Sequence, residues 1–326
     1  MRQLLVGWTA SLSLLCGLTG SGQELPPAPS AAVTPTAHCT DWIVSVRHCP
    51  KRRSQSHLAD FDVIRLDRCD GGQSSSLAEL VASLQPGVPV CLVLHGSFVN
   101  WPTVCDESRQ AQRWFRQACP GQPVHLIFFT WPSDHGTVVL FPMDVAILGR
   151  RASRHAQDVA QLIGQISDDH PICLVGHSHG ARMAVATLHL LGGGSIDGIC
   201  CPAGPYPRHR MRAVLAAAAF DHEWLNPGEC YDRAVCRAEG ILNLQNRHDW
   251  ALALYPLNRP GAARALGRSG LTGRDEQKLG PWSHKLIDLD VTDNVGHKHI
   301  WPAYLSQTEI AQAIAPYVFF ADPSPL

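Results

Sequence analysis

Nearly continuous apolar runs recur along this chain, and segments with a helical pattern separate them. The runs at 88–94, 124–129 and 172–175 are apolar on both faces of an extended chain. This is typical of strands in a parallel sheet that helices cover on both sides. Shorter runs predict further strands at 42–46, 61–66, 213–219, 241–244 and 285–291.

The clearest helical pattern lies between 152 and 166, where apolar residues recur every three or four positions on one face. Ser76 followed by Glu79 has the spacing of a capping box, which marks the start of a helix. Because strands and helices alternate along the chain, we expect an α/β fold with a doubly wound, mostly parallel sheet and helices on both faces. The helices are expected at 76–84, 109–118, 152–166 and 181–191.

Three regions follow from the way composition changes along the chain. Residues 1–22 contain Arg2, an uncharged apolar segment and then small residues, which is the pattern of a secretory signal peptide. Residues 23–37 are rich in Pro and Ala and predict an extended linker. One folded domain is expected over 38–326, with the Gly- and Arg-rich segment 260–281 as a surface excursion or lid.

Composition narrows the class of protein. With 326 residues, of which 45% are hydrophobic, the chain can bury the core of one large α/β domain. A formal net charge of −1 gives no electrostatic reason to expect a nucleic acid as partner. A membrane is expected as a partner only if the signal segment is retained, and the sequence does not specify an oligomeric state.

Twelve cysteines are many for a chain of this length, and export would permit disulfides. Cys91 and Cys173 lie inside apolar runs, where a free cysteine acts as a small core residue. Disulfides are expected among the others, and three candidate pairs are close in sequence: Cys39 with Cys49, Cys105 with Cys119, and Cys230 with Cys236. No CxxC pair is present, so a zinc ribbon is not indicated.

The segment Gly176-His177-Ser178-His179-Gly180 follows one of these apolar runs and precedes a helix. Gly-x-Ser-x-Gly between a strand and a helix is the pattern of a nucleophile elbow, a tight turn that exposes the serine at the helix N-terminus. The two glycines leave out side chains that would collide with the neighbouring strand and helix. We therefore expect Ser178 to be a nucleophile. The alternative is a tight turn without chemistry.

A serine needs a base, and in this architecture a histidine late in the chain supplies it, after an acid. His297 is the favoured base because Gly296 frees the loop to approach the serine, and His299 is the alternative. Asp249, just past a predicted strand, is the expected acid, and Asp221 is the alternative. No carboxylate or cysteine is patterned around the histidines, so no metal is expected.

Two backbone N–H groups are expected to hold the oxyanion. One belongs to His179, the residue after the nucleophile, and the other to Ser97, which follows a strand and His95-Gly96. The side chains of His177 and His179 are expected to pack against neighbouring loops, because a residue adjacent to Ser178 cannot easily bend back to act as its base.

These motifs together resemble the α/β-hydrolase superfamily, and more narrowly the bacterial esterase/lipase-like hydrolases of uncharacterised function. Trp131-Pro132-Ser133 after a strand matches their pattern, and Gly296-His297 matches their ending in part. The resemblance implies a serine hydrolase that needs no cofactor.

The expected function is therefore an exported serine hydrolase that cleaves a small-molecule or lipid carboxylic ester through a Ser-His-Asp triad and an acyl-enzyme. Two alternatives remain open. One is an acyltransferase or amidase that uses the same triad. The other is a non-catalytic extracytoplasmic binding protein.

Overall fold

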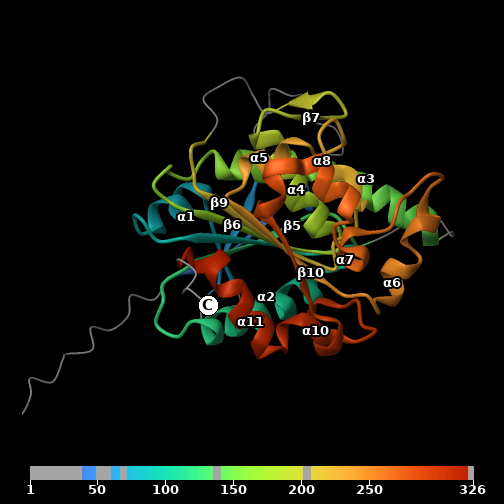
Figure 1. The fold of residues 1–326 in the computed structure, drawn as a ribbon. Coiled ribbons are helices and arrows are strands. Elements are labelled where there is room, and N and C mark those ends of the chain that lie inside the picture. Colours follow the sequence, from blue (N-terminus) through green and yellow to red (C-terminus); the bar gives the residue numbers. More distant parts are fainter. Residues whose placement is uncertain (1–38, 49–59, 67–71, 135–140, 201–206, 322–326) are drawn as a thin grey trace, which may run out of the picture. The chain divides into compact units, whose positions relative to one another are not determined.

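A computed structural model describes residues 39–48, 60–66, 72–134, 141–200 and 207–321 (Figure 1). The predicted signal peptide and linker, and the start of the folded domain at residue 38, lie outside these residues. Within the described ranges, no helix combines the length and the apolar content needed to cross a membrane.

One sheet of nine strands organises the domain, in the order β11-β10-β9-β6-β4-β5-β1-β2-β3. Neighbours from β11 to β1 run parallel, whereas β2 and β3 add antiparallel strands at one edge. The prediction of a mostly parallel sheet is confirmed. The strands are β1 (Asp41–Ser45), β2 (Asp62–Leu66), β3 (Gly72–Ser75), β4 (Val90–Leu94), β5 (His125–Thr130), β6 (Ile172–His177), β9 (Met211–Ala216), β10 (Gly240–Gln245) and β11 (Leu286–Asp290), and β7 (Ser195–Ile196) pairs separately with β8 (Ile199–Cys200).

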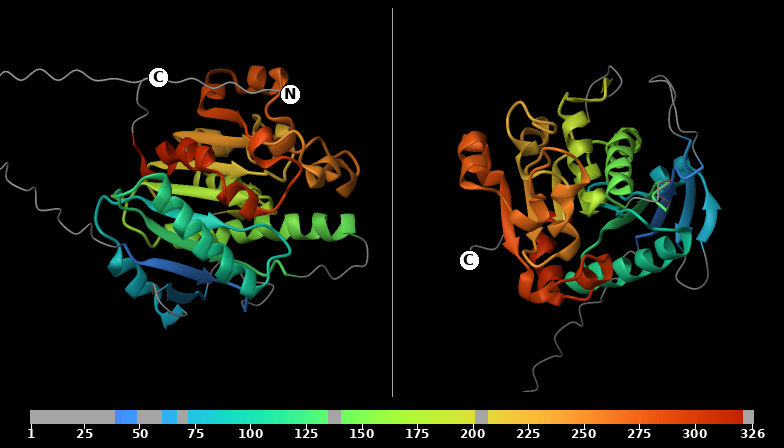
Figure 2. Two further views of the ribbon diagram at one scale, coloured as in Figure 1. Left: turned by 90° about the horizontal axis from the view of Figure 1, so that it is seen from below. Right: turned by 90° about the vertical axis from the view of Figure 1, so that its right-hand side faces the viewer.

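Helices cover both faces of this sheet, and each face has its own apolar core (Figures 1 and 2). On one face lie α1 (Leu77–Ser83), α3 (Phe141–Ile163), α4 (His179–Leu191) and α5 (Arg233–Arg237). On the other lie α2 (Trp101–Ala118), α10 (Trp301–Leu305) and α11 (Thr308–Phe319). The sheet is thus doubly wound, as the alternating pattern predicts.

The helix starts follow from local capping. Ser76 caps α1 by accepting a hydrogen bond from the N–H of Glu79 at 3.1 Å, as predicted. The Glu79 carboxylate accepts from the Ser75 hydroxyl. Helix α2 begins at Trp101, eight residues before the predicted start, because Asn100 caps it through the N–H of Thr103.

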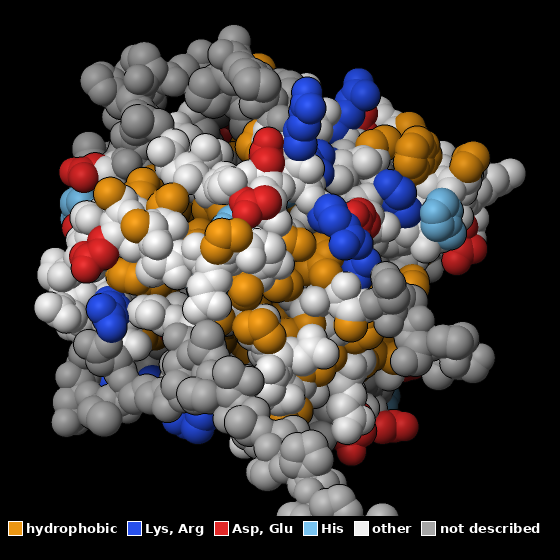
Figure 3. All heavy atoms as spheres, turned by 90° about the vertical axis from the view of Figure 1, so that its left-hand side faces the viewer, with side chains coloured by type: hydrophobic (Ala, Val, Ile, Leu, Met, Phe, Trp, Pro, Cys, Tyr) orange, Lys and Arg blue, Asp and Glu red, His pale blue; other side chains and the backbone are white. Residues whose placement is uncertain are grey.

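Short elements make up the connections that follow β9, β10 and β11. They are η1 (His222–Leu225), α6 (Trp250–Ala253), η2 (Tyr255–Asn258), α7 (Leu266–Ser269), α8 (Gly273–Leu279), η3 (Gly280–Lys285) and α9 (Thr292–Val295). Element α6 lies on the right of Figure 1 and α10 lies at its lower edge; the right-hand side faces the viewer in the right-hand panel of Figure 2. Figure 3 shows the opposite side, where hydrophobic side chains lie at the centre and Lys and Arg side chains lie above them.

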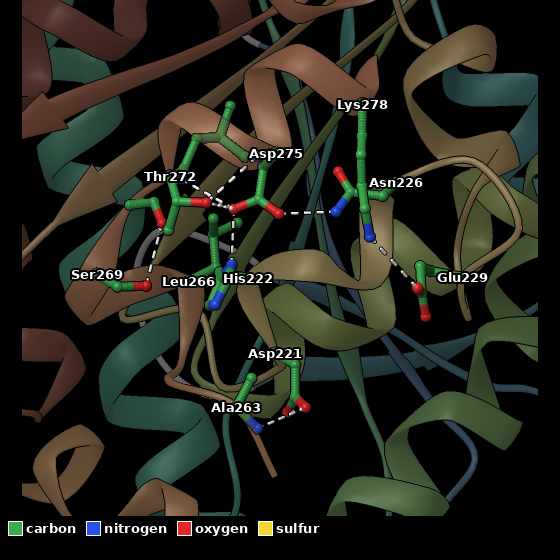
Figure 4. A network of polar contacts seen from close by, with 12 residues as sticks. Asp221, His222, Asn226, Glu229, Ala263, Leu266, Ser269, Thr272, Asp275 and Lys278 are labelled. Atoms are coloured by element: carbon green, nitrogen blue, oxygen red, sulfur yellow. Dashed lines mark hydrogen bonds and ion pairs between the residues drawn. The ribbon is translucent and has the colours of Figure 1, made fainter. Parts of the chain in front are cut away.

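The segment 260–281 was expected to form an excursion or lid, but the described structure packs it into the domain. Leu266 is fully buried, and a Cβ on Gly267 would lie 2.2 Å from the backbone nitrogen of Ala218. Helix α8 is fixed by the buried carboxylate of Asp275, which accepts from His222 and from Asn226, both at 2.7 Å (Figure 4). Glycine here serves close packing rather than flexibility.

Two of the three candidate short-range disulfides lie within the described residues, and neither is formed. Cys105 lies near the start of α2 and Cys119 caps its end, so four turns of helix hold them about 20 Å apart. Both are free thiols, as are Cys230 and Cys236. The third pair includes Cys49, which lies outside the described residues. Cys91 and Cys173 are buried and face each other across β4 and β6.

Candidate active site

The turn between β6 and α4 holds Ser178 in an unusual backbone conformation. Its φ is 54° and its ψ is −119°, a region that residues with a side chain rarely occupy. A Cβ on Gly176 would lie 2.4 Å from the carbonyl oxygen of Gly180, and one on Gly180 would lie 2.0 Å from that of Leu94. Both positions therefore require glycine. The turn has the geometry of a nucleophile elbow.

Ser178, His299 and Asp249 form a continuous line of hydrogen bonds. The Oγ of Ser178 lies 3.0 Å from Nε2 of His299, and Nδ1 of His299 lies 2.8 Å from Oδ2 of Asp249. The carboxylate can only accept, so Nδ1 carries the proton and Nε2 accepts from the serine hydroxyl. This is the tautomer in which the imidazole can take a proton from Ser178.

His299 occupies the position that was expected for His297. Gly296 does turn the chain, with a φ of 67°, but the turn directs His297 toward solvent. The ring of His297 stacks on that of His248 at 5.1 Å between centroids, and its Nδ1 lies 3.2 Å from the His248 carbonyl oxygen. Two further residues are needed before the loop reaches Ser178. The structure therefore brings His299, the alternative, and not His297 to hydrogen-bond distance from Ser178.

Asp249 is positioned by the helix that it caps. Its side chain is fully buried, and Oδ1 accepts from the N–H of Leu252 at 2.9 Å, which fixes the start of α6. The second oxygen is thereby left facing His299. The guanidinium of Arg268 also donates to the Asp249 carbonyl oxygen, which holds the backbone of the cap. Each carboxylate oxygen thus has one partner, and the orientation of the acid is fixed.

Asp221, the alternative acid, is engaged elsewhere. Arg259 donates to it at 2.6 Å, the Tyr255 hydroxyl at 2.9 Å and the backbone N–H of Ala263 at 2.9 Å. Figure 4 shows the last of these contacts beside the Asp275 network. Since no histidine is among these partners, Asp221 anchors the segment that follows α6 instead of completing a triad.

The loop after β4 lies directly against Ser178. A Cβ on Gly96 would lie 3.1 Å from the Cβ of Ser178, and the Ser97 hydroxyl lies 2.7 Å from Nδ1 of His179. Phe98 has a φ of 62° and donates its N–H to the Ser133 carbonyl at 2.6 Å. Among the described residues, no backbone acceptor contacts the N–H of Ser97 or of His179. His179 begins α4, where N–H groups lack a partner within the helix.

Three buried histidines surround the serine, and burial lowers the pKa of each to about 3. These are His95, His177 and His179. All three are therefore neutral near pH 7. His95 stacks on Trp131 and hydrogen-bonds the Gly96 carbonyl oxygen and the Thr130 hydroxyl, both at 2.8 Å.

His177 contacts the loop that carries His299. Its Nε2 lies 2.6 Å from the carbonyl oxygen of His299, so this nitrogen is the donor. Its ring also packs against Trp301 and Tyr304. The prediction that His177 and His179 pack against neighbouring loops is confirmed. The sequence did not reveal that the loop held by His177 is the one that carries His299.

A metal site is not formed by the described residues, since no three His, Cys, Asp or Glu side chains converge there.

The doubly wound sheet, the strained serine turn and the histidine after the last strand define the α/β-hydrolase architecture.

Comparison with known proteins adds distant structural likenesses. No family model matches the chain, and no curated protein matches its sequence. The catalytic core domain of acetyl xylan esterase from Trichoderma reesei is similar at 15% identity and a TM-score of 0.33, over 72% of this chain and 96% of that one. An iodinated complex of acetyl xylan esterase gives 11% identity and a TM-score of 0.30, over 70% and 91% of the two chains.

Proposed function

We propose that this protein is an exported serine hydrolase that cleaves carboxylic esters through an acyl-enzyme. The observation that carries the proposal is the line of hydrogen bonds from Ser178 through His299 to Asp249. A serine hydroxyl is a weak nucleophile, and a histidine at hydrogen-bond distance supplies the base that it lacks. The uncharged segment 4–18 after Arg2 supports export.

In the first half of the reaction, the Oγ of Ser178 attacks the ester carbonyl carbon while Nε2 of His299 takes the hydroxyl proton. The carbonyl π electrons move onto oxygen and form a tetrahedral oxyanion. When the carbonyl reforms, the bond to the alcohol oxygen breaks and His299 returns the proton to that oxygen. The alcohol leaves, and the acyl group stays on Ser178.

In the second half, water replaces the alcohol. His299 removes a proton from the water as its oxygen attacks the acyl carbon, and the same proton returns to Oγ as the serine leaves. Asp249 stabilises the imidazolium in both halves and keeps Nδ1 protonated. The carboxylic acid is the second product, and the protein is restored without any cofactor.

The oxyanion is assigned to the N–H groups of Ser97 and His179. Both belong to segments that lie against Ser178, and both point to no backbone acceptor among the described residues. The N-terminal end of α4 adds a partial positive charge at the same place. Donors fixed in advance by the fold stabilise the developing charge without reorganisation.

Covalent labelling by a fluorophosphonate tests the proposal. The wild-type protein should label on Ser178, with the site mapped by mass spectrometry, and Ser178→Ala should not label. Equal labelling of both proteins would remove Ser178 from the mechanism. Absence of labelling in a folded wild-type protein would favour the non-catalytic binding alternative. Product analysis with an added alcohol or amine would reveal acyl transfer, and an amide substrate would reveal amidase activity.

A further inference from the structure

We propose that a rim of exposed apolar side chains around Ser178 docks this protein on the surface of an assembled lipid ester, such as a micelle or an emulsion droplet. The inference rests on the proposed esterase function and adds the physical state of its substrate. In the following we call this surface the apolar rim. Its members are Phe98, Trp101, Met143, Trp250, Leu254, Leu257 and Ile300.

The exposed large hydrophobic residues are unevenly distributed. Among the described residues there are nine, and the seven of the apolar rim all lie in loops or helix starts at the carboxyl ends of the strands. The other two, Trp282 and Ile287, lie in η3 and near the start of β11, at the opposite end of the strands. Exposed apolar area gathered in one place marks a binding surface, whereas scattered single residues do not.

Three rim residues directly follow residues of the site. Phe98 follows Ser97, Trp250 follows Asp249 and Ile300 follows His299. Adjacent side chains on an irregular or extended chain point in different directions. A backbone that directs the site residue toward Ser178 therefore leaves the next side chain exposed to solvent. The exposed fractions of these neighbours are 46%, 55% and 60%.

The segment from α6 to η2 presents an apolar stripe. Trp250, Leu254 and Leu257 are spaced by four and three residues, as on one face of a helix. Leu254 and Leu257 are 49% and 70% exposed, whereas Leu252 and Tyr255 are buried. The Tyr255 hydroxyl donates to Asp221, which anchors the inner face of the segment. The outer face carries the exposed apolar side chains.

Contacts between elements connect the segments that carry the other rim residues. Helix α6 meets the histidine loop, where the N–H of Trp250 lies 3.5 Å from the His297 carbonyl oxygen. Next along the chain, η2 packs against α3, whose first turn exposes Met143. On the other side α10 packs against α2, whose first residue is Trp101. The right-hand panel of Figure 2 looks onto these elements.

The position of the apolar rim determines what can cover it. A protein partner or a second copy seated on all these side chains would cover Ser178 and block any substrate. A surface made of the ester itself removes the apolar side chains from water and presents the scissile bond at the same time. Tryptophan suits such a boundary, because its ring is apolar and its N–H can stay hydrated.

The experiment compares binding and turnover in two double variants. Leu254→Ser/Leu257→Ser removes two rim residues that contact none of the groups in the proposed triad. Trp282→Ser/Ile287→Ser removes a comparable exposed area from the opposite end of the strands and serves as the matched control. Binding is measured by co-sedimentation with phosphatidylcholine vesicles. Turnover is measured with p-nitrophenyl acetate in solution and with a tributyrin emulsion.

We expect the rim variant to bind vesicles at least about tenfold more weakly than the wild type and to lose a similar factor on the emulsion. Its turnover of the dissolved ester should stay within about twofold of the wild type. The control variant should match the wild type in all three measurements. Equal binding by both double variants, or a parallel loss on dissolved and emulsified esters, would overturn the docking role.

Ser178→Ala separates this inference from the proposed function. It should bind vesicles as the wild type does while losing turnover, since the rim is intact. If it binds vesicles and the wild type turns over no ester, docking stands and the esterase proposal fails. If the wild type turns over esters but does not bind vesicles, the esterase proposal stands and the docking proposal fails. A dimer that the rim variant dissociates would identify a second copy as the occupant and overturn the lipid proposal.

Discussion

His177 fixes the backbone of His299 through a hydrogen bond of 2.6 Å from its Nε2 to the carbonyl oxygen. In the proposed mechanism, the residue before the nucleophile thus positions the base that activates it. Burial lowers the pKa of His177 to about 3, so it remains a neutral donor throughout the physiological range. We therefore infer that His177, in the serine turn, is a positioning residue for the proposed base, His299.

Replacing His177 tests this relationship. In His177→Ala the carbonyl of His299 loses its donor and its ring loses a packing partner, so Nε2 should shift from Ser178 Oγ. We expect kcat on a soluble ester to fall by about a hundredfold with KM changed much less, because misplacement by about 1 Å has such an effect. His177→Gln keeps an N–H donor and should recover part of the loss. A change in KM alone, with normal kcat, would contradict the positioning role.

The two histidines of the late loop should behave differently. His299→Ala removes the group that touches Ser178 Oγ, and we expect kcat/KM to fall by about 10⁴ or more. His297→Ala removes a ring that stacks on His248 at the surface, and activity should stay within about threefold. Steady-state kinetics with one soluble ester measures both. A severe loss in His297→Ala with an active His299→Ala would restore the first assignment.

The sequence predicted the serine turn because its geometry is local. Gly176 and Gly180 lie within van der Waals reach of backbone atoms, so only glycine fits, and the pattern is visible in five residues. The choice between His297 and His299 depends on the path of the loop after α9 past the start of α6. No local sequence pattern predicts that path. The apolar residues Ile300 and Trp301 after His299 were the sequence signal that could have favoured His299. Trp301 is buried against His177 and so holds this part of the loop close to Ser178.

In the fold, too, the features with a local sequence pattern were predictable and those that depend on distant contacts were not. Buried parallel strands are apolar throughout and stand out, whereas β3 has the sequence GQSS and is defined only by its pairing with β2. Segment 260–281 has the composition of a loop, yet Leu266 fixes it to the apolar core and Asp275 fixes it through hydrogen bonds from His222 and Asn226. A few buried residues thus hold the segment in place, and its average composition does not reveal them.

The two aspartates should separate function from stability. Asp249→Asn keeps the shape and the cap of α6 but loses the charge that holds Nδ1 of His299 protonated, so kcat should fall by about 10³ to 10⁴. Asp221→Asn leaves Arg259 without its carboxylate partner. Because Arg259 is partly exposed, we expect a loss of about 2 kcal/mol in the free energy of unfolding.

Kinetics and urea unfolding of both variants check these outcomes. Asp221→Asn should retain turnover within a fewfold under conditions where it is folded, and Asp249→Asn should unfold near the wild-type midpoint. If Asp221→Asn loses activity while fully folded and Asp249→Asn does not, Asp221 is the acid.

Buried histidines should make the protein sensitive to mild acid. His95, His177 and His179 have pKa values lowered to about 3 by burial, whereas in the unfolded chain each titrates near 6.5. Below pH 6.5 the unfolded state therefore binds more protons, and stability that is present above that pH is lost as the pH falls toward 3. Between pH 7 and pH 5, each histidine should reduce the free energy of unfolding by about 1 to 2 kcal/mol.

Urea unfolding at pH 7, 6 and 5 measures this slope, and one variant assigns it. His95→Gln removes a titrating ring that hydrogen-bonds Gly96 and Thr130, so its stability at pH 7 should fall while its dependence on pH becomes shallower. The difference between wild type and variant should shrink by about 1 to 2 kcal/mol on going from pH 7 to pH 5. Asp275 has a pKa lowered to about 2 by its hydrogen bonds, although burial opposes the shift, and it acts below about pH 4. Burial raises the pKa of Glu107 to about 7, so this carboxyl gains stability as the pH falls through the same window and opposes the histidines. The comparison with His95→Gln therefore decides, and a difference between wild type and variant that stays constant from pH 7 to pH 5 would contradict a lowered pKa for His95.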